Sequence, residues 1–322
     1  MYSKARRYIR FVLSAAITIG IFILLFHKIP LGEVVNTIKK ANFKIILLIL
    51  GISLISNTVI SAKRWKLILE RLGCTISLKE SLFIKLGSDS VVSLLPIKIG
   101  EFSRMEYLKR LKNISYSKSL ISIISEYFLN IFMLILFAIT GAVIHLFQGS
   151  RLNVSVSSLR TLLPSFLLFS EKSHTASNTN IKLINNYFGL FKKSLGGLMM
   201  SLRSPSILFY SFLFMLAEIV NIYLLSRALH YPFPLYNIVL FVPIVILISS
   251  LPLTIAGLGL REAVVILFFL KLAPFQVLLS LGILYSFTEQ LFPMIIGTTL
   301  TGPFLIRIYY GKNENKLFSA SS

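Results

Sequence analysis

Long apolar runs constrain this chain more than any other feature of its sequence. Several approach or exceed the roughly 20 residues that an α-helix needs to cross a bilayer. Apolar residues make up 55% of the 322 positions, and charged residues only 14%, far below the roughly 25% of soluble proteins. The sequence therefore predicts an all-α integral membrane protein. The clearest runs are 11–26, 45–62, 120–147, 207–225 and 277–300.

The charge of the chain is strongly positive, and its distribution fits a membrane protein. The sequence has 33 Lys and Arg against 12 Asp and Glu, a net charge of +21. Because the basic residues flank apolar segments, we expect them to lie in cytoplasmic loops and to contact anionic lipid headgroups. We expect no nucleic-acid partner. A single cysteine, Cys74, excludes an internal disulfide, and the histidines form no ligand pair, so we expect neither metal nor cofactor.

Two short apolar segments, 81–95 and 238–251, each end at a proline. Neither is long enough to cross about 30 Å of hydrocarbon. Proline removes a helix donor, and the glycines that follow release the backbone. Free backbone groups at membrane depth need protein or water around them, so we interpret each segment as the start of a re-entrant helical hairpin. The predicted breaks lie at Pro96, Gly100, Pro252, Gly257 and Gly259.

The two hairpins also resemble each other in sequence. The first reads "SLLPIKIGEFSRMEYL" from Ser93, and the second reads "SSLPLTIAGLGLREAV" from Ser249. An arginine follows each break with an acid beside it, and the next span carries an acid near its start. These shared features predict an internal duplication with halves of about 8–147 and 152–306.

The distribution of basic residues predicts how the halves are oriented. The basic stretch at 4–10 favours a cytoplasmic N-terminus. If 152–169 crosses the membrane, the chain has about six spans plus two re-entrant hairpins, and its halves are inverted repeats. The polar loop and amphipathic helix at 170–204 and the tail at 307–322 are then cytoplasmic. Without that crossing the halves are parallel and the tail lies outside. We expect a multi-pass protein of the cell membrane.

Ionisable residues within the membrane are costly, so they are the candidates for function. We hypothesise that both hairpins meet at a central cavity, where the two arginines bind an anionic headgroup. The acids would pair with the arginines when the cavity is empty, or couple to protons; the alternative is a set of structural ion pairs. We expect Asp89 to cap or line the first hairpin, and we expect Arg64 and Trp65 to anchor a helix at the membrane interface rather than to contact a headgroup. The candidates are Arg104, Arg261, Glu262, Glu126, Glu289, Glu101 and Glu218.

Four stretches of the sequence resemble a known family, the lysylphosphatidylglycerol synthase transmembrane or flippase-like family. They are "SAKRWKLIL" at 61–69, "LLPIKIGEFSRMEYL" at 94–108, "SEYF" at 125–128 and "LPLTIAGLGLREAV" at 251–264. The resemblance covers about 5–310. The chain departs from the family pattern at Ile97 and Ala256, where glycine is common.

The resemblance implies that the protein moves a lipid between leaflets. The lipid would be an anionic or aminoacylated phospholipid, or a polyprenyl-linked lipid. The sequence leaves no room for the soluble synthase domain that accompanies this region in some members, so we do not expect aminoacyl transfer. Two alternatives stay open: an integral-membrane lipid transferase, and an accessory subunit that partners a lipid-pathway or glycan-pathway enzyme.

Overall fold

The computed structural model describes residues 2–94, 100–147, 196–197, 199–251, 254 and 257–319. Within these ranges the chain is helical and has no strand. Among the described residues, four helical segments are long and apolar enough to cross a membrane. The predicted fold class, a polytopic helical membrane protein, is therefore confirmed. The four segments are Phe43–Arg71, Tyr116–Phe147, Pro205–Ala228 and Phe275–Tyr310.

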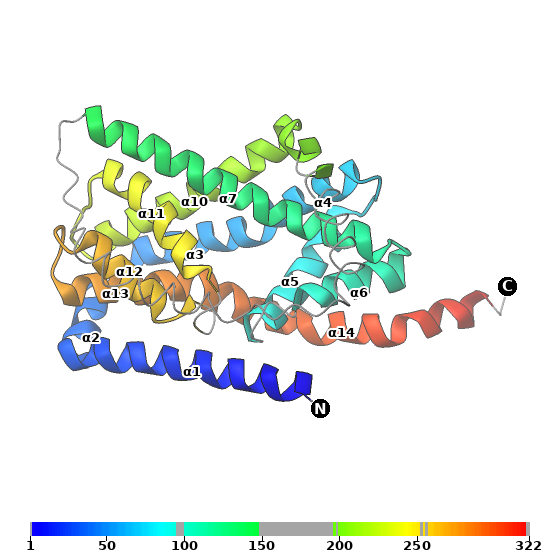
Figure 1. Cartoon of the computed structure of the whole chain (residues 1–322), viewed down its shortest axis with the longest axis horizontal. Coiled ribbons are helices and arrows are strands. Elements are labelled where there is room, and N and C mark those ends of the chain that lie inside the picture. Colours follow the sequence, from blue (N-terminus) through cyan, green and yellow to red (C-terminus); the bar gives the residue numbers. More distant parts are fainter. Residues whose placement is uncertain are drawn as a thin grey trace, which may run out of the picture.

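The first apolar run forms α1 (Tyr2–Lys28), which lies along one edge of the molecule (Figure 1). Pro30 then turns the chain into the short helix α2 (Leu31–Lys39). The segments Ser14–His27 and Leu31–Lys39 meet at 84° and have the hydropathy of a span only when taken together. Helix α2 contacts α13 and buries Val34, so it ties the N-terminal region to the second half of the chain.

Two of the long spans contain a π-helical turn. The span Phe43–Arg71 consists of α3 (Phe43–Ile55), η1 (Ser56–Ile60) and α4 (Ser61–Arg71). The last span consists of α13 (Phe275–Ser286), η4 (Phe287–Leu291) and α14 (Phe292–Ser319). The two spans touch at this level, where the Ser53 hydroxyl donates to the Thr288 carbonyl oxygen at 2.6 Å. Such turns are often found at functional sites, because they rotate side chains out of the regular helix.

Both predicted hairpins appear as pairs of short helices in contact with each other. The first pair is α5 (Leu78–Leu94) and α6 (Gly100–Lys112). The second is α11 (Leu235–Ser249) and α12 (Leu260–Phe269). Helix α5 packs against α14, whereas α11 packs against α7 (Tyr116–Phe147) and α12 against α13. Each hairpin is thus held by the long spans around it.

The glycines lie where the sequence predicted the second helix of each pair to begin. Helix α6 starts at Gly100, and Gly259 precedes the first residue of α12. Gly257 and Gly259 have φ angles of 76° and 81°, in the left-handed region that side chains rarely adopt. The prolines Pro96 and Pro252 lie outside the described residues.

The boundaries of the halves remain predictions. The segment 152–169, on which the inversion depends, lies outside the described residues, as does 170–195 of the predicted cytoplasmic loop. The end of the last span differs from the sequence expectation, because α14 continues from the span to Ser319 without a break at 300. The physical reason is packing: Phe304 and Ile308 are buried in an apolar cluster with Ile84 and Leu108 of the first hairpin.

Candidate functional site

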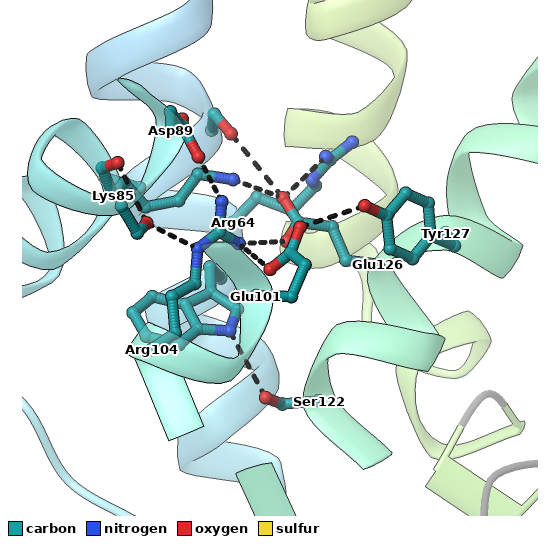
Figure 2. A network of polar contacts seen from close by, with 12 residues as sticks. Arg64, Lys85, Asp89, Glu101, Arg104, Ser122, Glu126 and Tyr127 are labelled. Carbon is teal, nitrogen blue, oxygen red and sulfur yellow. Dashed lines mark hydrogen bonds and ion pairs between the residues drawn. The ribbon is translucent and has the colours of Figure 1, made fainter. Parts of the chain in front are cut away.

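Glu126 on α7 is the centre of a buried charge network in the first half (Figure 2). Its carboxylate accepts from Arg64 at 3.0 Å and from Lys85 at 2.7 Å, and Arg104 lies 3.4 Å away. The three cations come from α4, α5 and α6, and their side chains are at most 6% exposed. A carboxylate in so little water stays ionised only beside such partners. The network therefore fixes four helices around one charge.

Arg104 connects the two helices of the first hairpin to α7. Besides Glu126, its guanidinium binds Asp89 of α5 and lies 3.2 Å from Glu101, one turn earlier on α6. Its Nε donates to Ser88 at 2.8 Å, and the guanidinium carbon lies 5.6 Å from the centre of the Trp65 ring. Arginine suits this place, because its planar fork donates several hydrogen bonds in fixed directions.

A cavity of about 240 Å³ opens beside this network. At about 30 Å³ for each water molecule, it has room for about eight waters or a polar group of that size. Its wall comes from the long spans and the first hairpin. Its charged residues are Arg64, Lys85, Arg104, Asp89, Glu101, Glu126 and Glu289. Among these formal charges the carboxylates exceed the cations by one.

Glu289 connects the cavity to a second polar cluster. It sits on the π-helical turn η4, where Asn57 donates to its carboxylate at 3.0 Å and Asn221 donates to its other oxygen. In the second cluster, the Tyr285 hydroxyl donates to Glu218 at 2.6 Å. Arg261 lies over the Tyr285 ring, 5.2 Å from its centre, with its Nη1 3.5 Å from the Ser286 hydroxyl. Both π-helical turns thus supply polar groups to the region between the clusters.

Glu262 interacts with the start of its own helix. Its carboxylate accepts from the backbone N–H of Gly259 at 2.6 Å and from the Ser286 hydroxyl at 2.5 Å. An acid three residues after the N-cap often satisfies that backbone donor, and it also complements the positive end of the helix dipole. The side chain is buried, and it does not line the cavity.

The structure separates the two arginines that were expected to share one cavity. Arg104, Glu101, Glu126 and Glu289 line it, whereas Arg261, Glu262 and Glu218 do not. The reason is that the hairpins pack against different parts of the last span, α5 against α14 and α12 against α13, on either side of the π-helical turn η4. Arg261 therefore faces the second cluster. The roles of all seven candidates toward a ligand stay predictions.

The expectation that Arg64 and Trp65 anchor a helix at the membrane interface is wrong. Arg64 is 1% exposed and Trp65 is fully buried. Arg64 binds Glu126 and donates to the Asn130 side-chain oxygen at 2.7 Å, while the Trp65 ring N–H donates to Ser122 at 3.2 Å. Both point to α7, because α4 packs along that helix.

Sequence reasoning also missed several residues that line the cavity, although features of the sequence could have pointed to some of them. Lys85 lies in a segment at membrane depth, where a lysine is costly enough to indicate a function. Asn130 follows Glu126 by one helical turn and so shares its face. Asn57 gave no signal, because its position depends on the π-helical turn. Among the described residues, no group of three His, Cys, Asp or Glu is placed to hold a metal ion.

These features define a polytopic helical membrane protein with a charged cavity between its spans. The chain belongs to the lysylphosphatidylglycerol synthase TM region family, whose model matches residues 11–297. The resemblance seen in the sequence motifs is therefore confirmed. A search of curated proteins finds no match. Membership of the family gives the protein a membrane function related to lipids.

Proposed function

We propose that the protein moves a lipid between the two leaflets, with the headgroup passing through the cavity while the acyl chains stay in the bilayer. The observation that carries the proposal is the cavity itself, which combines seven charged side chains with walls from membrane spans. Charged groups are too costly at membrane depth to persist without a role. Its volume of about 240 Å³ suits a headgroup and excludes a whole lipid.

The charges in the cavity favour a headgroup that carries both signs. Arg64 and Arg104 offer guanidinium groups that suit a phosphate. A purely anionic headgroup would nevertheless meet more carboxylates than cations, and it would compete with Glu126 for them. An ammonium group on the same headgroup has Glu289 as a partner, because this carboxylate lines the cavity and forms no salt bridge within the described ranges. We therefore favour an aminoacylated phospholipid over a simple anionic phospholipid or a polyprenyl-linked lipid.

The membrane location and orientation are part of the same proposal. The basic residues at 4–10 support a cell-membrane protein with a cytoplasmic N-terminus, and we place the C-terminus on the same side.

A leaflet-exposure assay tests the proposal. The purified protein is placed in vesicles with tail-labelled lysyl-phosphatidylglycerol, or with tail-labelled phosphatidylglycerol as the anionic counterpart. A membrane-impermeant quencher then reports which leaflet holds the label. We expect the aminoacylated lipid to cross faster than the anionic lipid, with its mass unchanged.

Variants locate the movement in the cavity. Arg104→Gln should slow the exchange by about tenfold or more, the effect of losing one or two charge-assisted hydrogen bonds. Arg227→Gln is the matched control, because Arg227 lies over the Tyr223 ring outside the cavity and should retain the wild-type rate. Equal rates in protein-free vesicles would contradict the proposal. A new lipid mass would favour a transferase instead.

A further inference from the structure

Glu218 and Glu289 face each other across the interface between α10 (Pro205–Ala228) and the span that contains η4. Tyr285, one turn before Glu289, donates to Glu218, and Asn221, one turn after Glu218, donates to Glu289. Glu218 is 9% exposed and lies away from the cavity. Glu289 is half-buried and lines the cavity. The pair therefore has one carboxylate in the protein interior and one in contact with the space in which a headgroup would bind.

Cations surround this pair far less than they surround Glu126. Within the described ranges, Glu126 forms salt bridges to three basic residues, whereas neither Glu218 nor Glu289 forms any. The titratable groups facing the pair are Tyr285 on α13, which donates to Glu218, and Arg261 on α12. The charged groups across the cavity are Arg64, Lys85, Arg104, Asp89, Glu101 and Glu126.

Asn221 supplies a second and independent observation. The residue is fully buried, and its amide nitrogen donates to Glu289. Its amide oxygen has no hydrogen-bond partner among the described residues. The oxygen belongs to the same planar group as the nitrogen, so it lies beside the carboxylate pair. A buried acceptor next to two further acceptors lacks a donor, and a buried polar atom is costly without one.

A bound proton supplies a donor to the carboxylate pair. Two carboxylates that lie side by side with little water cannot both be ionised at low cost, and one proton between them turns repulsion into a hydrogen bond. Within the described ranges, no group of three His, Cys, Asp or Glu side chains is placed to hold a metal ion. We therefore take a proton as the ligand of the pair.

We propose that Glu218 and Glu289 form a proton-binding pair that exchanges its proton with the cavity. The proposal deepens the proposed function, on which its coupling to lipid movement rests. An ammonium group that approaches Glu289 from the cavity would favour the ionised carboxylate and release the proton. A proton gradient could then drive net lipid movement in one direction.

Infrared difference spectroscopy tests the proton site without any lipid movement. The protein is titrated with alkali in phosphatidylcholine vesicles, in light and in heavy water. We expect a stretching band of a protonated carboxyl group near neutral pH, which shifts in heavy water and disappears as the pH rises. Glu218→Gln and Glu289→Gln should each remove it. Glu106→Gln is the matched control, because Glu106 pairs with Arg110 away from the cavity, and its replacement should leave the band in place.

A conservative variant keeps the test decisive if a glutamine variant fails to fold. Tyr285→Phe removes the hydroxyl that donates to Glu218 and should move the disappearance of the band to higher pH. Absence of the band in the wild-type protein would overturn the proposal. So would a band that persists in both Glu218→Gln and Glu289→Gln.

A second experiment tests the coupling separately. In vesicles where the wild-type protein exchanges labelled lysyl-phosphatidylglycerol, an imposed pH gradient should shift the label toward one leaflet, and a sodium gradient should not. Lipid exchange that does not respond to the pH gradient would overturn the coupling of proton binding to lipid movement. The proposed function would not be affected by that result. The spectroscopic arm is independent of exchange, so a failure of lipid movement alone would count against the proposed function and not against the proton site.

Discussion

At the scale of the residue, Glu126 decides how the first half is held together. Three buried cations on three helices share this one carboxylate. Replacing a buried ion pair as a whole is often tolerated, but removing one partner leaves the others unpaired in a medium that solvates them poorly. Removing Glu126 therefore affects three cations at once. Of these cations, Arg104 would keep Asp89 and Glu101 as carboxylate partners.

We predict that Glu126→Gln destabilises the protein by about 3 kcal/mol or more. The reason is that Arg64 and Lys85 lose the carboxylate with which each of them forms a salt bridge. Thermal unfolding in detergent measures the effect. Glu106→Gln is the control, since Glu106 binds Arg110 in a partly exposed pair, which contributes no more than about 1 kcal/mol.

A double variant checks the cause of the Glu126 effect. Lys85→Met removes one of the cations that Glu126→Gln leaves unpaired. The combined variant should therefore be less destabilised than the sum of the two single changes. Simple additivity would contradict the view that the network acts as one unit.

At the scale of the element, the start of α12 depends on backbone conformations that glycine alone adopts readily. Gly257 and Gly259 both have positive φ, and a Cβ on Gly257 would lie 2.7 Å from the Ser249 carbonyl oxygen. The turn brings the Gly259 N–H to Glu262. Glu262 therefore caps the start of this helix by accepting from a backbone N–H. The local structure alone explains the motif "GLGLRE", without a ligand.

We predict that Gly259→Ala lowers the stability by about 1–3 kcal/mol, because alanine is strained in the left-handed region. The matched control is Gly51→Ala in α3, where an added Cβ meets no atom within 4 Å. That change should be neutral or stabilising, because alanine stabilises a helix more than glycine does. Thermal unfolding of both variants compares them directly, and equal effects would show that the turn tolerates a side chain.

At the scale of the whole molecule, the two hairpins pack against different parts of the last span and face different polar clusters. The first faces the cavity with Arg104, and the second faces Tyr285 and Glu218 with Arg261. Glu289 lies between them on η4, so one residue touches both environments. This separation fits the two ligands that we propose, a headgroup in the cavity and a proton at Glu218 and Glu289.

We predict that both termini are cytoplasmic, which requires an even number of crossings. In a Cys74→Ser background, single cysteines near residue 4 and near residue 319 should react with an impermeant thiol reagent only after the cells are opened. A cysteine at Arg110, at the basic end of α6, serves as a cytoplasmic reference. Labelling of one terminus in intact cells would mean that 152–169 does not cross and that the halves are parallel.

The sequence alone determined the class of the fold, the short broken helices and most of the charged candidates. These depend on composition, on run length and on the conformational limits of proline and glycine, which are local properties of the chain. The acid and arginine positions in "GEFSRMEYL" and "GLGLREAV" could be singled out for the same reason, since their cost at membrane depth does not depend on their neighbours.

Only the tertiary structure decided which of these charges meet. Arg64 reaches Glu126 because α4 packs along α7, and Asn57 reaches Glu289 because the spans touch at their π-helical turns. Arg261 is kept from the cavity by the packing of α12 against α13. Contacts of this kind join residues 62 to 232 positions apart. Sequence periodicity specifies which face of a helix a residue occupies, but the partner of that face is set only when the helices pack.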